Sequence, residues 1–253
     1  NLHEEQIEWA DVIIVMHVPQ WIEKNWEKIK HKRVIWRTIG QSIQDVEMRL
    51  RPFRDQGMEI VRYSPMEENI PGYLGSDAMI RFYKDPTEFG SWVGGNGTIM
   101  TVGQSVKQRG TFCNYDSFHA ATEGLPRKLF GPNNNDCEEN AGELSYDELK
   151  KQLRENRVFF YTGTHPASYT LGFIEALMTG IPIVSIGQAL GNSRLFNGQK
   201  TFEIPSIIQN GHNGYVSDNI NELHDMAKQL LDNYSLAKQI SENGRRTAID
   251  MFG

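Results

Sequence analysis

Residues 168–182 read SYTLGFIEALMTGIP, and this stretch decides the fold class. Its apolar residues recur at helical spacing, which predicts a short helix that opens at Thr170 or Leu171. Two apolar runs, 157–163 and 181–187, flank the helix and are typical of buried strands. A strand, a helix and a strand in this order predict an α/β protein with a parallel sheet and helices on its faces.

The same alternation extends over most of the chain. Further strands are predicted at 10–17, 33–36, 58–63, 98–103 and 127–131, and further helices at 42–57, 111–124 and 145–156 and over the last thirty or so residues. The Gly-rich segment 86–97 separates the two series of strands. We therefore predict two α/β domains, 1–95 and 96–253, with the boundary in a segment whose composition is typical of a linker.

Composition excludes several classes of protein. The chain of 253 residues is 39% hydrophobic and 23% charged, which is the balance of a soluble globular protein. No apolar run reaches the roughly 18 residues that a transmembrane segment needs. The net charge is −6 and only residues 28–33 cluster basic side chains, so we expect no nucleic-acid partner. Cys113 and Cys137 lack a paired metal spacing, so we expect no metal site and a cytoplasmic setting, with peripheral membrane contact left open.

Glu175 stands alone in an apolar segment. Between Arg157 and Arg194 it is the only formally charged residue, His165 set aside. A carboxylate in or beside a core needs partners, because burying it unpaired is expensive. Those partners are either donors of the protein, such as backbone amides or a Ser or Thr hydroxyl, or hydroxyl groups of a ligand. Carboxylates hold ribose hydroxyls in other nucleotide-binding folds, so both alternatives stay open.

The opening of the same helix is a candidate anion site. Its first amides have no intrahelical acceptor and lie at the positive end of the helix dipole. Gly172 would let an anion approach the backbone closely, or would let the helix pack tightly against a neighbour. Ser168 or Thr170 can cap the helix.

The loop VGQSVKQRG at 102–110 follows the predicted strand 98–103 and offers two cations. Lys107 and Arg109 would lie at the carboxyl edge of the sheet, where a diphosphate leaving group needs positive charge. Arg109 can hold a phosphate through two parallel hydrogen bonds. A loop that contains Lys and Arg is also typical of a solvated turn.

These features resemble the retaining, nucleotide-sugar-dependent glycosyltransferases of the GT-B fold, in particular family 4. The resemblance covers residues 98–250 and rests on VGQSVKQRG, on the helix with the strand GIPIV after it, and on EIPSIIQNGHNGYVSDN at 203–219. It implies two Rossmann-like domains, of which the first is incomplete in this chain. Because the chain opens on Asn1 rather than Met, we expect that further residues precede it.

The resemblance also implies a donor site without a metal ion or other cofactor. In the family, amides at the helix opening bind the donor diphosphate and the second of two glutamates binds the ribose, which by position is Glu175. The donor-binding residues implied for this chain are Gly103, Gln104, Ser168, Tyr169, Thr170, Leu171, Gly172 and Glu175.

Two positions depart from the family pattern. Eight residues before Glu175 the chain has Ala167 in place of the first glutamate, which lies near the donor sugar in the family. The loop arginine of the family is Gln104 here, and its lysine is Arg109. We expect weaker recognition of the sugar and weaker stabilisation of the leaving group, so transfer is slow or absent. His165 or Ser168 are alternative hydrogen-bonding groups for the sugar.

We therefore predict transfer of a sugar from a UDP- or GDP-linked donor to an acceptor hydroxyl, with retention. Arg109 and His17, which ends the predicted strand 10–17, are the candidate catalytic residues. One alternative, favoured by Ala167 and Gln104, is a non-catalytic module that binds nucleotide-sugars on the same scaffold. Another is an epimerase on a related fold, whose cleft acids are not found in the sequence. The acceptor is left open, as is a homo-oligomer.

Overall fold

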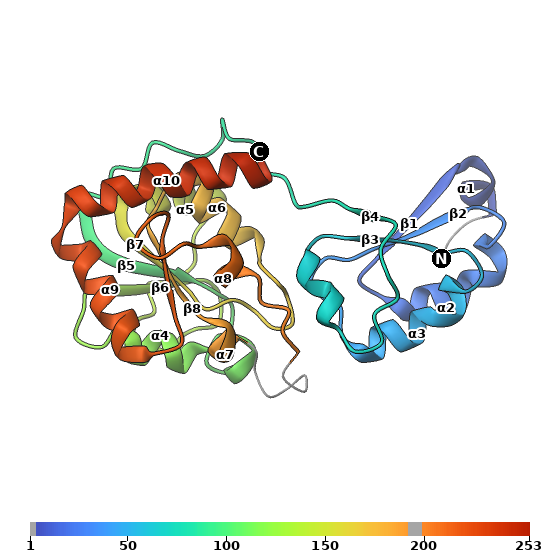
Figure 1. The fold of residues 1–253 in the computed structure, drawn as a ribbon, viewed down its shortest axis with the longest axis horizontal. Coiled ribbons are helices and arrows are strands. Elements are labelled where there is room, and N and C mark those ends of the chain that lie inside the picture. Colours follow the sequence, from blue (N-terminus) through green and yellow to red (C-terminus); the bar gives the residue numbers. More distant parts are fainter. Residues whose placement is uncertain (1–3, 192–198) are drawn as a thin grey trace. The chain divides into compact units, whose positions relative to one another are not determined.

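A computed structural model of the chain describes residues 4–191 and 199–253. They form two compact units (Figure 1). The first unit extends to Arg81 and includes the short segments Pro166–Ser168 and Gln199–Thr201, and the second contains the remaining residues. Each unit is built on a parallel sheet with helices, which confirms the predicted α/β class.

The described part of the first unit has a four-stranded parallel sheet in the order β1-β2-β3-β4. Its strands are β1 (Val12–Met16), β2 (Arg33–Arg37), β3 (Glu59–Arg62) and β4 (Ala78–Met79). Its helices are α1 (Glu4–Trp9), α2 (Pro19–Ile29), α3 (Gln44–Arg54) and the 3₁₀ helix η1 (Pro65–Asn69).

The core of this unit lies between the helices and one face of the sheet. Ile22, Trp26 and Ile29 recur at helical spacing along α2 and are buried in one cluster with Val34 and Trp36 of β2. The apolar residues of α2 recur at helical spacing and those of β2 alternate, so each set lies on one face and the two faces meet. The sequence analysis did not predict α2.

The second unit has a five-stranded parallel sheet in the order β6-β5-β7-β8-β9. Its strands are β5 (Asn96–Val102), β6 (Arg127–Phe130), β7 (Asn156–Tyr161), β8 (Ile183–Ile186) and β9 (Tyr215–Ser217). Its helices are η2 (Gly110–Phe112), α4 (Tyr115–Ala121), α5 (Tyr146–Glu155), α6 (Leu171–Thr179), α7 (Gln188–Gly191), α8 (Ile204–Ile207), α9 (Ile220–Asp232) and α10 (Tyr234–Phe252).

Helices cover both faces of this second sheet. Figure 1 shows α5, α6 and α10 on one side, where they pack together, and α4 with α9 on the other. The centre of the sheet is therefore buried on both faces, and β8 consists of buried residues throughout. Helix α6 is buried from Phe173 to Thr179, which explains why the segment around Glu175 contains so few charges.

The segment 82–95 belongs to the second unit and is held there by specific contacts. The backbone N–H of Lys84 donates to the carbonyl of Phe252 at 2.9 Å. The indole N–H of Trp92 donates to the carbonyl of Asn156, also at 2.9 Å. The first continuous stretch of the first unit therefore ends at Arg81, whereas glycine content places the boundary at 95/96. A backbone hydrogen bond and the Trp92 side chain anchor a segment whose composition is typical of a linker.

Candidate functional site

The carboxyl ends of the parallel strands of the second unit share one edge of the sheet, where ligands bind in open α/β folds. Gly103, Gln104 and Arg109 follow β5 at this edge, and Thr170 precedes the opening of α6 after β7. The structure thus brings the loop 103–110 and the helix opening to the same edge of one sheet, as the sequence predicts.

The loop after β5 is held by close contacts around Gly103. A Cβ atom at Gly103 would lie 2.4 Å from Cγ1 of Val106, so a larger residue does not fit there. Asn134 is buried and its amide bridges the loop: Nδ2 donates to the carbonyl of Gly103 at 2.7 Å, and Oδ1 accepts from the amide of Val106 at 3.0 Å. Asn134 is a positioning residue that the sequence analysis missed, because it lies far from the loop in the chain.

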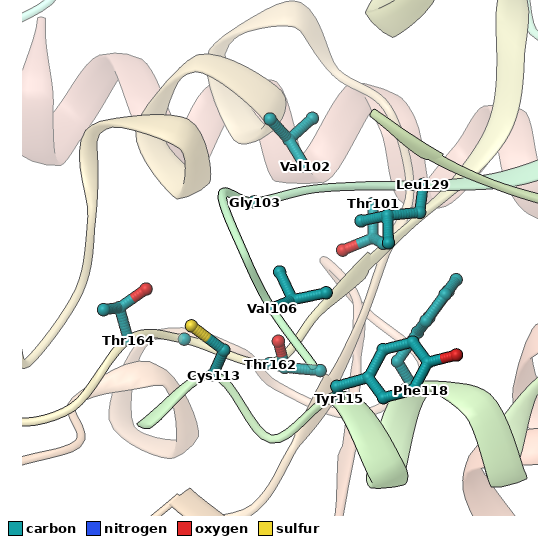
Figure 2. Close-up of a pocket in the computed structure, with 11 residues that line it drawn as sticks. Thr101, Val102, Gly103, Val106, Cys113, Tyr115, Phe118, Leu129, Thr162 and Thr164 are labelled. Carbon is teal, nitrogen blue, oxygen red and sulfur yellow. The ribbon is translucent and has the colours of Figure 1, made fainter. Parts of the chain in front are cut away.

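A pocket lies beneath this loop (Figure 2). Hydroxyl groups of Thr101, Thr162 and Thr164 and the thiol of Cys113 line it beside the aromatic rings of α4. Burial raises the pKa of Cys113, and the positive charge of Arg109 opposes this shift. The complete lining is Thr101, Val102, Gly103, Val106, Cys113, Tyr115, Phe118, Leu129, Thr162, Gly163 and Thr164. The pocket is therefore bordered by groups that can bind hydroxyls and by the field of one cation.

Lys107 and Arg109, the two cations of the loop, differ in their hydrogen bonding. Lys107 donates from Nζ to the carbonyl of Asp136 at 3.0 Å. Arg109 is exposed, and its guanidinium makes no hydrogen bond or ion pair with any residue that the structure describes. Arg109 is thus the cation of this loop that is available to a phosphate group.

The opening of α6 is uncapped. Thr170 occupies the N-cap position with an extended backbone, but its side chain makes no capping hydrogen bond, so the sequence prediction that Ser168 or Thr170 caps the helix is wrong for Thr170. The hydroxyl of Tyr161 instead accepts the backbone N–H of Thr170 at 3.1 Å, just before the helix begins. The following amides at Leu171 and Gly172 keep the anion-binding potential of a helix N-terminus.

Gly172 does not mediate close helix packing. A Cβ atom added there would meet, among the described residues outside the helix's own backbone, only Oγ1 of Thr170 at 3.8 Å, which is ordinary contact distance. Of the two explanations for this glycine, tight packing against a neighbour is therefore not found. A helix N-terminus with room for a methyl group at Gly172 favours the close approach of a ligand.

The carboxylate of Glu175 has a protein partner. Nζ of Lys84 lies 2.5 Å from Oε1 of Glu175, and the two side chains are only 19% and 9% exposed. The partner is thus neither a backbone amide nor a hydroxyl, the protein donors considered from the sequence. The proposed role of Glu175 on a ribose has to accommodate this ammonium group.

A second hollow adjoins the loop on the side of β6. Val102, Phe130, Pro132 and Leu144 give it apolar walls, and Glu143 adds one carboxylate. Gly131 and Leu149 complete the lining. Gly131 has φ +127, and a Cβ atom there would lie 2.2 Å from the carbonyl oxygen of Gly103, so the hollow and the loop are built on one tight backbone contact.

The remaining predicted residues of this group are His17, Ser168 and Tyr169. His17 follows β1 in the first unit, is exposed and has a left-handed backbone with φ 74. Ser168 is buried in the same unit, and its amide donates to the hydroxyl of Tyr63 at 2.6 Å. The ring of Tyr169 is buried against Phe252, with ring centroids 5.3 Å apart, so its side chain does not face a ligand site.

His165 follows β7 and is buried. Its backbone N–H donates to the carbonyl of Phe112 at 2.8 Å. Burial lowers the pKa of its imidazole to about 4, so the ring is neutral near pH 7. His165 therefore adds no positive charge to the site.

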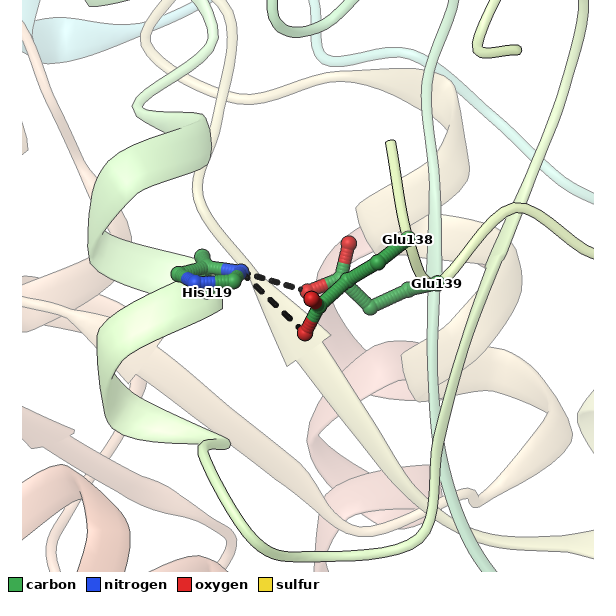
Figure 3. A group of neighbouring side chains, drawn as sticks. All are labelled: His119, Glu138 and Glu139. Carbon is green, nitrogen blue, oxygen red and sulfur yellow. Dashed lines mark hydrogen bonds and ion pairs between the residues drawn. The ribbon is translucent and has the colours of Figure 1, made fainter. Parts of the chain in front are cut away.

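One side-chain group among the described residues has the spacing of a metal site (Figure 3). His119, Glu138 and Glu139 each place a ligand atom within 4.8 Å of the others. Arg127 already supplies a cation there: its Nη2 contacts the carboxylate of Glu138 and lies 3.2 Å from Oε1 of Glu139. Its Nη1 donates to the carbonyl of His119 at 2.8 Å, which fixes the guanidinium in place. We therefore interpret the group as a structural ion-pair network, which sequence spacing did not reveal.

No helix in the described ranges combines the length and the apolar character that a membrane crossing requires. No protein-family model and no curated protein sequence matches the chain.

Solved structures of glycosyltransferases share the fold. HepE of Anabaena in complex with UDP-glucose aligns with a TM-score of 0.72 at 12% identity, over 98% of this chain and 76% of HepE. A glycosyltransferase of Rickettsia africae aligns with a TM-score of 0.66 at 12% identity, over 99% and 75% of the two chains. TarM of S. aureus, in a complex that contains UDP, aligns with a TM-score of 0.65 at 12% identity, over 95% of this chain and 52% of TarM. The similarity establishes the glycosyltransferase fold that the sequence predicts.

Proposed function

We propose that this protein binds a nucleotide-diphosphate sugar at the carboxyl edge of the second sheet and transfers the sugar to an acceptor hydroxyl with retention, without a metal ion. One observation carries the proposal. The N-terminus of α6 has no side-chain cap, a Cβ atom at Gly172 would make only an ordinary contact with Thr170 among the described residues, and Glu175 follows by one helical turn. This arrangement suits an anion followed by a hydroxyl-bearing ring, which is the chemistry of a diphosphate joined to ribose.

Different residues at this edge of the sheet bind different parts of the nucleotide-sugar donor. The amides at Leu171 and Gly172 and the guanidinium of Arg109 bind the diphosphate, because they are the donors with no other engagement. Glu175 binds the ribose hydroxyls. We assign the base to the hollow between Val102 and Leu144, because its lining is mainly apolar.

The chemistry requires charge stabilisation more than proton transfer. The bond between the anomeric carbon and the phosphate oxygen breaks and the diphosphate keeps the electron pair. The acceptor oxygen bonds to the same face of the sugar, and its proton passes to the departing phosphate oxygen. Donors aimed at the departing diphosphate each lower such a barrier by about 3–4 kcal/mol. Arg109 and the α6 amides are therefore the groups on which the rate depends.

The neighbouring structures support a uridine nucleotide as the first ligand to test. HepE has been solved with UDP-glucose and TarM with UDP. GDP is the second candidate, because the hollow is lined mostly by apolar side chains and its one charged group, Glu143, can accept hydrogen bonds from N–H groups of a base.

Calorimetric titration with UDP, GDP and ADP tests the binding half of the proposal. We expect one diphosphate to bind, and Glu175→Ala to lose about tenfold or more in affinity, which corresponds to about 1.4 kcal/mol. Glu88→Ala, an exposed acid of the same unit, is the control. Equal affinity for Glu175→Ala and wild type would remove the ribose assignment, and absence of binding by all three diphosphates would remove the proposed function.

A non-catalytic module is the second candidate, favoured by Ala167 and Gln104 at positions where the resembled family has a glutamate and an arginine. Incubation with UDP-glucose and chromatography of the products separates the two. Release of free UDP supports transfer or hydrolysis. Tight binding without release over many hours supports the module.

A further inference from the structure

Lys84 connects the segment after the first unit to the interior of helix α6. Its backbone is fixed by the hydrogen bond to Phe252, and its side chain extends to the carboxylate of Glu175. The ammonium group lies 5.7 Å from the ring centroids of both Phe89 and Tyr146. Burial alone would lower the pKa of Lys84, but the hydrogen bond to Glu175 and its negative charge raise that pKa above the usual value. Lys84 is therefore positively charged near pH 7.

This contact limits what else Glu175 can bind. Lys84 covers Oε1 at 2.5 Å, and only 9% of the Glu175 side chain is exposed. Ribose hydroxyls that bind this carboxylate would donate to the same two oxygens, and Oε1 already accepts from Lys84. The ribose and the ammonium group therefore compete for the same carboxylate.

A permanent structural ion pair in this protein has a different geometry. Arg62 and Glu47 are fully buried and joined by two parallel hydrogen bonds of 2.6 and 2.8 Å, and the amide of Leu74 adds a third at 3.0 Å. Such a fork locks both oxygens of the carboxylate. Lys84 is instead a single point charge on a flexible side chain that engages one oxygen, so it can be exchanged for other donors at little geometric cost.

We propose that Lys84 occupies Glu175 in the nucleotide-free protein and leaves it when the ribose of a nucleoside diphosphate binds. Lys84 thereby sets the nucleotide affinity, because each binding event has to break the ion pair first. The inference rests on the proposed function, since it needs Glu175 to be the residue that binds the ribose.

Substitution of Lys84 is expected to strengthen nucleotide binding, whereas substitution of a residue that binds the nucleotide would weaken it. In Lys84→Met the carboxylate of Glu175 has no ammonium partner, and ribose hydroxyls satisfy it instead. We expect UDP to bind about three- to tenfold more tightly than to wild type, because the free protein no longer gains from the ion pair. Lys150→Met is the matched control: Lys150 also lies near the ring of Tyr146, at 4.8 Å, but pairs with Asp147 rather than Glu175.

The double variant Lys84→Met/Glu175→Gln tests whether the effect passes through Glu175. We expect the gain in UDP affinity from Lys84→Met to disappear when Glu175 is already Gln, since there is then no carboxylate for which Lys84 and the ribose compete. Lys84→Gln, which keeps a polar end, provides a second variant in case the methionine form does not fold, as judged by circular dichroism.

The reactivity of the Lys84 amine gives a readout that does not depend on affinity. Reductive methylation followed by mass spectrometry measures how fast each lysine of the wild-type protein reacts. An amine held in an ion pair reacts slowly, so we expect saturating UDP to accelerate methylation of Lys84 and to leave Lys150 unchanged. Slower or unchanged labelling of Lys84 with UDP bound would overturn the inference.

The outcomes separate the inference from the proposed function. UDP binding that is weakened or unaltered by Lys84→Met overturns the inference alone, because Lys84 would then assist the nucleotide or not meet it. Failure of wild type and of Lys84→Met to bind UDP, GDP or ADP overturns the proposed function and the inference with it.

Discussion

The hydroxyl oxygen of Tyr161 accepts the backbone N–H of Thr170 at 3.1 Å and lies 3.2 Å from Oγ1 of the same residue. Tyr161 ends β7 and Thr170 precedes the first residue of α6, so this pair ties the strand end to the helix opening. The Tyr161 side chain is buried, and burial raises the pKa of its hydroxyl, which therefore stays neutral and can accept and donate.

Tyr161→Phe removes the acceptor of a partly buried amide while it keeps the ring. We expect the free energy of unfolding to fall by about 1–2 kcal/mol, the usual cost of leaving such a group unpaired. Urea denaturation followed by circular dichroism measures the change. Tyr83→Phe, at an exposed tyrosine, is the control, and a loss no larger than in that control would show that the pair does not hold the helix opening.

Alanine substitutions at Gly131 and Gly142 distinguish the cost of a steric clash from the cost of backbone strain. Both have positive φ, +127 and +86, but a Cβ atom at Gly131 would lie 2.2 Å from the Gly103 carbonyl oxygen, whereas at Gly142 it meets no described atom within 4 Å. We expect Gly142→Ala to cost about 1–2 kcal/mol from conformation alone. Gly131→Ala should cost clearly more, because the loop after β5 must move, and thermal denaturation ranks the two. Equal losses would contradict the close contact.

The sequence predicts the centre of the second sheet well, and the reason is physical. The segments of β7, α6 and β8 are buried nearly throughout, so their apolar runs leave little choice of secondary structure. Gly103 and Gly172 are also found at the carboxyl edge, because strand, loop and helix follow one another within a few residues there.

Contacts between distant segments could not be predicted in this way. The sequence indicates that Glu175 needs a partner but does not identify Lys84, whose position depends on how segment 82–95 runs along α10. Asn134 and the Arg127 network likewise join residues through the tertiary fold rather than through spacing. Helix α2 was missed although Ile22, Trp26 and Ile29 recur at helical spacing with polar residues between them, so the signal for this helix was present in the sequence.

The lowered pKa of buried His165 predicts that stability depends on pH. Its pKa is about 4 in the folded protein and about 6.5 in the unfolded chain, so between these values the unfolded chain binds a proton that the folded protein does not. The free energy of unfolding should therefore fall as the pH drops from 6.5 towards 4, by about 3 kcal/mol in total from this residue. Denaturation of wild type and His165→Asn across this range measures the difference.

The comparison of slopes, rather than of absolute stabilities, tests this cause. His165→Asn should be less sensitive to pH over the window than wild type, whatever the substitution costs at pH 7. Parallel curves for wild type and His165→Asn would show that the imidazole is protonated in the folded protein.

Arg109 and Lys107 provide a matched pair of cations in one loop. Arg109 has no partner among the described residues, whereas Lys107 is engaged by the carbonyl of Asp136. We expect Arg109→Gln to weaken UDP binding about tenfold or more, the scale of a lost charge-assisted hydrogen bond, and Lys107→Gln to have a smaller effect. Titration with UDP and with uridine distinguishes a phosphate contact, since only UDP binding should respond. A larger loss from Lys107→Gln would reverse the assignment of the two residues.

Gly172→Ala should separate stability from binding. The described surroundings leave room for the methyl group, and alanine in a helix is favoured over glycine by about 1 kcal/mol, so the free energy of unfolding should rise by up to that amount. The same methyl group would stand over the amides at which we place the diphosphate, so UDP should bind more weakly although the protein is more stable. Denaturation and calorimetry on one preparation measure both quantities. A stabilised variant with unchanged UDP affinity would show that the diphosphate does not approach Gly172.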